Sequence, residues 1–167
     1  MNRILIIVIL ALLITSCTDS TEPADENLSL KITPQNQTIN LDDQAEFSVV
    51  LENAEGFFAF SAEILFNGNI ISLTENSVAA GSGWGTNSPL TVTENEVDRL
   101  SITIGLTQTS STDAINGDLT LFTFNVRGDE VGSSEIWFQN IYLIDDEGNA
   151  IAGTENLEIE TGNITVE

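Results

Sequence analysis

The chain has 167 residues, 41% of them hydrophobic, which is enough to fill the core of one domain and argues against a disordered acidic tail. Its 26 acidic residues against 4 basic ones give a formal net charge of −22. That charge argues against binding nucleic acid or adsorbing directly onto an anionic membrane, because both are polyanions. It fits a surface solvated in salty surroundings, with an acidic site for a basic partner or for cations as the alternative.

Residues 1–16 are expected to be a lipoprotein signal peptide. Arg3 gives a positive start, and residues 4–14 are a continuous apolar run. This run is shorter than the roughly 20 residues that span a bilayer, and it fits the core of a signal peptide. The tetrad Ile-Thr-Ser-Cys that ends at Cys17 resembles the lipobox of bacterial lipoproteins, which implies cleavage before Cys17 and lipidation of its thiol. An ordinary secretory signal followed by a free thiol is the alternative, since Cys17 is the only cysteine.

Residues 17–27 are expected to form an acidic tether. After Cys17 the sequence TDSTEPADEN holds four acids and a proline, and its one apolar residue is Ala24. Ten extended residues reach at most about 33–36 Å, so such a tether keeps the domain close to its membrane. Acidic residues directly after a lipidated cysteine also resemble surface-export signals of some Bacteroidota-type lipoproteins. We therefore expect a lipid-anchored protein of the bacterial cell envelope, at the outer membrane, with display on the cell surface implied by this resemblance.

Residues 28–167 are expected to be one all-β domain. Apolar and polar residues alternate with period two, and turn residues recur every 8–12 positions. No run of ten residues has helical apolar spacing. This pattern predicts a two-sheet antiparallel β-sandwich of about nine strands, in which a broken final pair within 157–166 follows strands at 28–32, 38–41, 45–51, 57–66, 70–73, 90–93, 99–106, 119–127 and 135–144.

Three local features sharpen this prediction. Asn53 to Gly56 is expected to be a turn. The alternation slips between Phe138 and Ile141, which predicts a β-bulge near Gln139 and Asn140. The side chains expected to fill the core are Phe47, Phe58, Phe60, Phe66, Phe122, Phe124 and Phe138.

Four segments, in order, resemble bacterial cohesin domains, the jelly-roll receptors of cellulosome scaffolds. Residues 58–73 (FAFSAEILFNGNIISL) resemble the cohesin strand, turn and short strand, and residues 118–127 (DLTLFTFNVR) resemble a later strand. IDDEGNAI within 141–151 resembles a turn of the family, and GNITV at 162–166 resembles its closing strand. The resemblance covers residues 28–167 and implies a jelly-roll sandwich that binds a dockerin-type protein domain through one exposed sheet face.

The resemblance places ligand-binding side chains on the outward face of two strands, 57–66 and 99–106. The family's asparagine and aspartate are replaced by Ala59 and Ser61, and Asn67-Gly68 stands where the family has Asp-Pro. Cohesins are also structural relatives of cellulose-binding sandwiches, so polysaccharide is the competing ligand. The candidate binding residues on this face are Ser61, Glu63, Arg99, Ser101 and Thr103.

Two tryptophans are further candidates for sugar binding. Trp84 lies in the glycine-rich stretch Gly-Ser-Gly-Trp-Gly and is a candidate stacking platform. Trp137 has the opposite parity to Ile136 and Phe138, which predicts an exposed side chain. Packing against a sheet edge or a lid is the alternative for both, because tryptophan is usually mostly buried.

The acidic turn at Asp145, Asp146 and Glu147 resembles part of a calcium loop, because clustered carboxylates suit a hard cation. The EF-hand spacing and its final glutamate are absent, so we expect a solvated hairpin turn and no metal site. Calcium binding by these carboxylates is the alternative.

The chain has no histidine, no free thiol once Cys17 is lipidated, no Gly-x-Ser-x-Gly motif and no phosphate loop, so we expect no enzyme. The sequence thus predicts a non-catalytic, cohesin-like module that binds polysaccharide or a dockerin-type protein. The alternative is a structural or assembly lipoprotein that engages another envelope protein and binds no sugar. Trp84 and Trp137 exposed on one face would favour sugar, whereas a smooth face around Ser61, Ser101 and Thr103 with a hydrophobic centre would favour a protein partner.

Overall fold

A computed structural model describes residues 27–85, 88–107 and 113–167. The described chain is almost entirely β-structure, and its single helical element is a 3₁₀ turn, η1 (Thr154–Asn156). Within these ranges no helix is long and apolar enough to cross a membrane. The predicted two-sheet antiparallel β-sandwich is confirmed.

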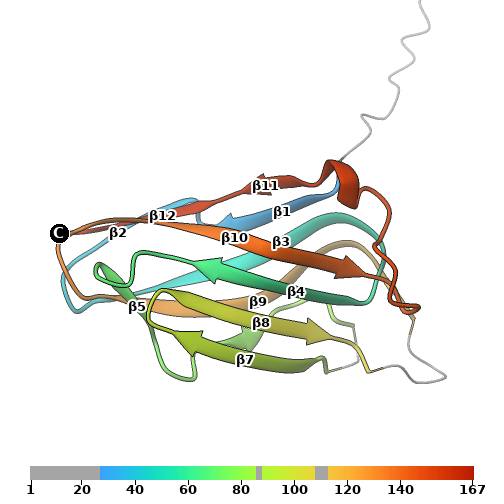
Figure 1. Cartoon of the computed structure of the whole chain (residues 1–167), viewed down its shortest axis with the longest axis horizontal. Coiled ribbons are helices and arrows are strands. Elements are labelled where there is room, and N and C mark those ends of the chain that lie inside the picture. Colours follow the sequence, from blue (N-terminus) through green and yellow to red (C-terminus); the bar gives the residue numbers. More distant parts are fainter. Residues whose placement is uncertain (1–26, 86–87, 108–112) are drawn as a thin grey trace, which may run out of the picture.

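Two sheets of six strands pack face to face (Figure 1). The first has the order β11-β1-β3-β9-β5, with β6 also paired to β9, and consists of β1 (Ser29–Thr33), β3 (Gln44–Phe57), β5 (Ile71–Leu73), β6 (Ala79–Ala80), β9 (Ile115–Gly128) and β11 (Glu158–Glu160). The second has the order β2-β12-β10-β4-β8-β7 and consists of β2 (Asn36–Ile39), β4 (Ala59–Leu65), β7 (Leu90–Glu96), β8 (Arg99–Gly105), β10 (Gly132–Ile144) and β12 (Gly162–Val166).

The first and last segments of the domain each cross from one sheet to the other. β1 and β2 lie in different sheets and are separated by Pro34, which lacks a backbone N–H and interrupts the ladder. β11 and β12 make the same crossing at Thr161. In each sheet, a strand from the start of the domain therefore lies parallel to one from its end, β1 beside β11 and β2 beside β12. The other strand pairs are antiparallel. The structure has twelve strands where about nine were expected, and the strand that the alternation did not predict is the two-residue β6.

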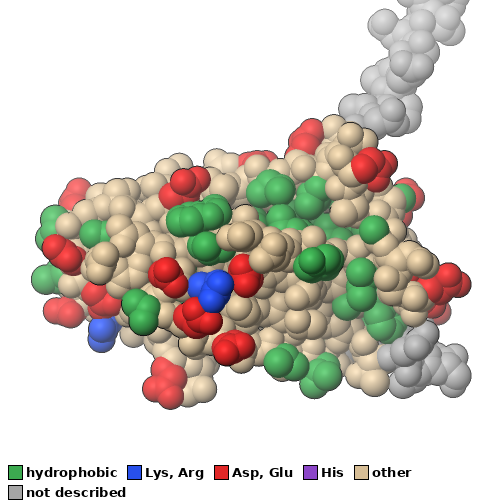
Figure 2. Space-filling model, in the orientation of Figure 1, with side chains coloured by type: hydrophobic (Ala, Val, Ile, Leu, Met, Phe, Trp, Pro, Cys, Tyr) green, Lys and Arg blue, Asp and Glu red, His purple; other side chains and the backbone are tan. Residues whose placement is uncertain are grey.

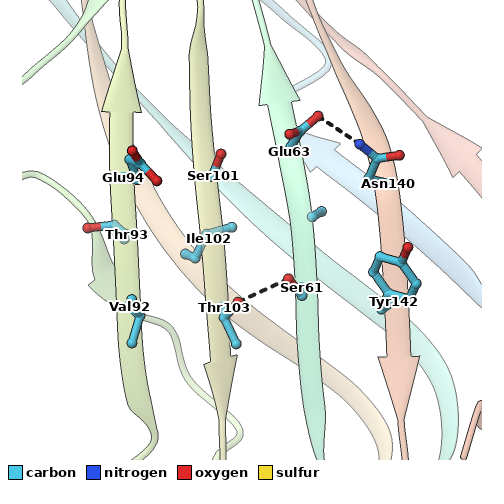
Figure 3. Close-up of a pocket in the computed structure, with 11 residues that line it drawn as sticks. Ser61, Glu63, Val92, Thr93, Glu94, Ser101, Ile102, Thr103, Asn140 and Tyr142 are labelled. Carbon is cyan, nitrogen blue, oxygen red and sulfur yellow. Dashed lines mark hydrogen bonds between the residues drawn. The ribbon is translucent and has the colours of Figure 1, made fainter.

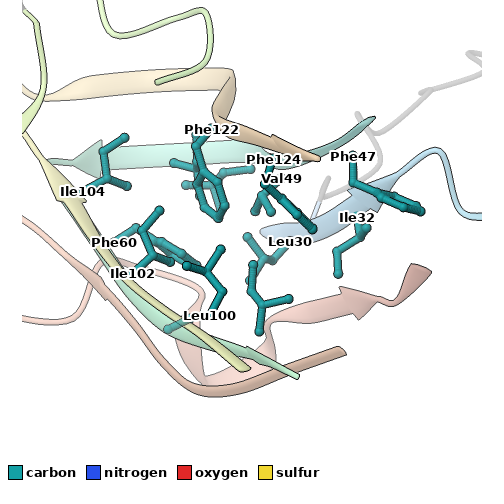
Figure 4. Packing of buried hydrophobic residues seen from close by; sticks show 14 of the residues in the cluster. Leu30, Ile32, Phe47, Val49, Phe60, Leu100, Ile102, Ile104, Phe122 and Phe124 are labelled. Atoms are coloured by element: carbon teal, nitrogen blue, oxygen red, sulfur yellow. The ribbon is translucent and has the colours of Figure 1, made fainter. Parts of the chain in front are cut away.

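The core lies between the sheets and is rich in phenylalanine (Figure 4). The rings of Phe47 and Phe124 stack with centroids 5.8 Å apart, and those of Phe60 and Phe122 lie 6.1 Å apart. Among the described residues the core runs from Leu28 to Val166, so this part of the chain has a core of its own. The predicted set is confirmed with one exception, because Phe138 is only partly buried.

The turn predicted at residues 53–56 is wrong. β3 continues to Phe57 and carries shifts of register on either side of Ala54. Asn53 and Gly56 take positive φ angles of 57° and 69°, which bend the strand without ending it. The shifts turn Phe57 inward, and this residue, missed by the sequence reading, is fully buried.

The bulge predicted in β10 is confirmed. The pairing of β10 with β4 shifts register between Gln139 and Tyr142, and Asn140 has a φ of 52°. The extra residue keeps both Trp137 and Tyr142 on the outward side of the sheet, where both are exposed.

Candidate functional site

The outward surface of β7, β8, β4 and β10, here called the open face, carries the candidate binding residues that the strand alternation predicted. In β4, Phe60, Ala62 and Ile64 point into the core, so Ser61 and Glu63 point outward. Figure 2 shows apolar side chains scattered over this side of the molecule and, near its middle, a basic side chain among acidic ones. The structure therefore brings Ser61, Glu63, Arg99, Ser101 and Thr103 together on one surface.

Strand register arranges the open face in two rows that run across the strands (Figure 3). The hydroxyl row consists of Val92, Thr103, Ser61 and Tyr142. The acidic row consists of Glu94, Ser101, Glu63 and, at the bulge of β10, Asn140. A shallow depression of about 290 Å³ lies over both rows.

In the hydroxyl row, two hydrogen-bonded polar side chains lie between an exposed valine and an exposed tyrosine. Ser61 Oγ and Thr103 Oγ1 are 3.0 Å apart and share a hydrogen bond. Val92 and Tyr142, at the ends of the row, are 60% and 62% exposed. The centre of the row is therefore polar and not hydrophobic, and its exposed aliphatic and aromatic side chains lie at the two ends. Exposed apolar side chains of this kind are a feature of surfaces that bind another molecule.

The acidic row keeps a negative charge even though a basic side chain lies beside it. Asn140 Nδ2 donates to Glu63 Oε2 at 2.9 Å, and Arg99 Nη1 lies 3.4 Å from Glu63 Oε1. Arg99 Nη2 pairs with Glu96, and this hydrogen bond raises the pKa of Arg99 above its ordinary value. The side chain of Glu94 makes no hydrogen bond or ion pair with another described residue. Arg99 is thus neutralised by its own neighbours, and Glu94 is left for a partner.

Trp84 is not part of this surface. Its side chain is 4% exposed, its Nε1–H donates to the carbonyl oxygen of Leu121 at 2.9 Å, and its ring packs 5.6 Å from that of Phe57. The loop can press this close because Gly83 has no side chain, and a Cβ there would lie 2.5 Å from Leu119 Cβ. The candidate stacking platform at Trp84 is therefore wrong, and the packing alternative is confirmed.

Trp137 is exposed, as its parity predicted, on the outward side of β10 opposite Leu65 of β4. Because Trp84 is buried against the other sheet, the two tryptophans do not share an exposed face.

The acidic turn after β10 uses its first carboxylate for its own backbone. Asp145 Oδ1 accepts hydrogen bonds from the backbone N–H groups of Glu147 at 2.9 Å and Asn149 at 2.8 Å. The Asn149 backbone bond, helped by the Asn149 side chain, lowers the pKa of Asp145. Over the described ranges no three His, Cys, Asp or Glu side chains are grouped to hold a metal ion. A calcium role for Asp145, Asp146 and Glu147 stays a prediction, as does the lipidation of Cys17, which lies outside the described residues.

The sequence reading missed four contributors to the open face, namely Val92, Glu94, Asn140 and Tyr142. The first two lie on β7, which was predicted to end at residue 93 and runs to Glu96. Val92, Glu94 and Glu96 lie at every second position, and this alternation could have indicated that the strand continues to residue 96. The outward direction of Asn140 and Tyr142 depends on the bulge. Its position was predicted from the sequence, but the side chains that it turns outward are known only from the register of β10 with β4.

Comparison with known proteins gives no match to a family model and no match among curated proteins. Among solved structures, a non-cellulosomal cohesin from the hyperthermophilic archaeon Archaeoglobus fulgidus matches with a TM-score of 0.66 at 18% identity, covering 84% of this chain and 91% of that one. A chain of a type I cohesin–dockerin complex from Clostridium thermocellum has a TM-score of 0.68 at 17% identity, covering 84% and 99%. A type II cohesin domain from the cellulosome of Acetivibrio cellulolyticus has a TM-score of 0.69 at 13% identity, covering 83% and 95%. The chain therefore has the jelly-roll β-sandwich fold of cohesin domains.

Proposed function

We propose that this domain is a non-catalytic binding module that captures a protein partner, of the dockerin type, on the open face. The observation that carries the proposal is the hydroxyl row, where exposed Val92 and Tyr142 flank a hydrogen-bonded Ser61–Thr103 pair in a shallow depression. The bond between the two hydroxyls offsets part of the desolvation cost when this surface is covered, and burial of Val92 and of the Tyr142 ring adds favourable free energy. Similarity to a chain from a cohesin–dockerin complex supports a protein partner.

The proposal places the module on a lipid anchor in the bacterial envelope, at the outer membrane. The support is the lipobox-like tetrad at Cys17 with the acidic stretch that follows it. Several acyl chains on one cysteine hold stably, whereas a single chain anchors only marginally.

The test is a pull-down with soluble residues 18–167 as bait, exposed to envelope and secreted proteins of its own cells, with and without calcium. We expect a protein partner whose capture is lost when Ser101→Lys and Thr103→Lys are combined, because two long charged side chains then cover the centre of the face. The matched control combines Ser48→Lys and Thr123→Lys, which pair on the outward side of the opposite sheet. Equal capture by the Ser101/Thr103 variant and the wild type would remove the open face from consideration.

Polysaccharide is the second candidate ligand, and one observation favours it. Trp137 and Tyr142 are both exposed on the outward side of β10, where their rings offer a stacking surface for sugar. Insoluble polysaccharides, run in parallel, would retain the domain and release the Trp137→Ala variant if this candidate is right. If neither a protein nor a polysaccharide binds, the structural or assembly role is favoured instead.

A further inference from the structure

We propose that the partner of the open face is a polypeptide segment that carries an apolar anchor and, about 13 Å away, a lysine or arginine. The anchor enters a groove beside the hydroxyl row, and the basic side chain lies over the acidic row. This inference rests on the proposed function, since it names the chemistry of the partner that the same face would take.

The groove has largely apolar walls and a floor of two small residues. A hollow of about 340 Å³ is lined by exposed Leu90 and Val92, by the largely buried Leu106 and by Thr103 and Thr107, with Ala59 and Gly105 paired across β4 and β8 beneath it. A Cβ added at Gly105 would lie 2.4 Å from Ala59 Cβ, so the absence of a side chain there hollows the floor. Leu90, at the rim, is 67% exposed. An apolar side chain seated in the groove would remove these walls from water.

The acidic row supplies the charge that selects the partner. Glu94 and Glu63 lie on either side of Ser101 (Figure 3), so a cation above Ser101 would lie between two carboxylates. Glu94 has no partner among the described residues, and Arg99 is already held by Glu63 and Glu96. The other two basic residues of the described chain are likewise paired, Lys31 with Glu52 and Arg127 with Asp129. An acidic segment would therefore meet repulsion here, and a basic one attraction.

Strand geometry sets the spacing between the two contacts. Leu90 and Glu94 are four residues apart on β7, which is about 13 Å at roughly 3.3 Å per residue. About four residues of an extended segment, or about nine residues of a helix, cover that distance. A second copy of this chain does not fit, because a two-fold contact of the open face would bring its own unpaired glutamates together.

A display library of random peptides about 16 residues long, selected on residues 18–167 at low salt, tests the inference, because that length covers the spacing in extended or helical form. We expect the selected peptides to combine Lys or Arg with a large apolar residue. Their binding should weaken about tenfold or more in Glu94→Lys, and a peptide with its basic residue changed to glutamate should bind Glu94→Lys better than wild type. Leu90→Ser should also weaken binding, whereas Val131→Ser, at a comparably exposed valine remote from the groove, should not.

The outcomes separate the inference from the function on which it rests. Peptides that lose binding in the combined Ser101→Lys and Thr103→Lys variant, yet show no basic enrichment and no response to Glu94→Lys, would overturn the inference and leave the open face as a protein-binding surface. Peptides that bind all these variants equally, or a library that yields no binder, would contradict both.

Discussion

Phe124 lies at the centre of the core and contacts two other rings. Its centroid is 5.8 Å from that of Phe47 and 6.1 Å from that of Phe122, and all three side chains are fully buried. Phe124→Ala would remove these contacts and leave a cavity, so we expect it to lower the free energy of unfolding by about 3–5 kcal/mol. Urea titration followed by tryptophan fluorescence measures the loss. Val131→Ala, at an exposed turn, is the control and should change stability by less than about 0.5 kcal/mol. A loss of similar size in both variants would contradict this account of the core.

Asp145 predicts a dependence of stability on pH. Its pKa in the folded domain is lowered below the ordinary value of an aspartate, first by the hydrogen bond from the backbone N–H of Asn149. A lowered pKa means that the ionised carboxylate stabilises the fold above about pH 4, and that this contribution is lost as the pH falls through the folded-state pKa. Asp145→Asn should therefore be less stable than wild type at pH 7, and the difference should shrink below about pH 4. Thermal unfolding of both proteins between pH 7 and pH 3 measures this. A difference that stays constant over that range would show that the charge has no such role.

At the scale of the strand, β7 is the open edge of the second sheet. Leu90 and Val92 are exposed on it, and Glu94 and Glu96 follow at the next outward positions. Charged residues on a free edge oppose pairing with the edge of another molecule. Glu94→Val extends the exposed apolar alternation, so we expect concentration-dependent association in sedimentation experiments.

The matched control is Glu135→Val. Glu135 is also an exposed glutamate on a strand, but β10 is paired on both sides, by β12 and β4. The control should remain as monodisperse as the wild type. Association of both variants to the same extent would mean that added hydrophobicity, and not the free edge, is responsible.

The strands themselves were largely predictable, because alternation marks them independently of their partners. The bulge of β10 was also visible as a slip of parity between Phe138 and Ile141. The errors occur where long-range pairing overrides local signals. Asn53 and Gly56 are good turn residues and bend β3, yet pairing with β9 continues beyond them to Phe57.

The candidate site was predictable in part for the same reason. Ser61, Ser101 and Thr103 could be assigned to an outward face from alternation within their own strands. Their alignment with Glu94 and Tyr142 depends on register across four strands, which alternation does not reveal. The burial of Trp84 depends on a loop packing against β9, and its glycine-rich sequence fits an exposed loop equally well.

At the scale of the whole molecule, the described chain starts far from the groove. Asn27 is held by hydrogen bonds to Glu158 of β11 and Asn53 of β3, while Leu90 lies on β7 at the opposite edge of the sandwich (Figure 1). The point at which a tether would join the domain therefore lies at the edge opposite the groove. The proposed anchor and the proposed binding surface are thus compatible in one molecule.

The central claim is that the open face binds a protein partner, and NMR chemical-shift mapping of isotope-labelled residues 18–167 with the captured partner tests it most directly. We predict that the shifts change along β7, β8, β4 and the bulged part of β10, with the largest changes near Val92, Glu94, Thr103 and Tyr142. Changes confined to the outward side of β1, β3 and β9, or to the turn at residues 145–149, would contradict the claim.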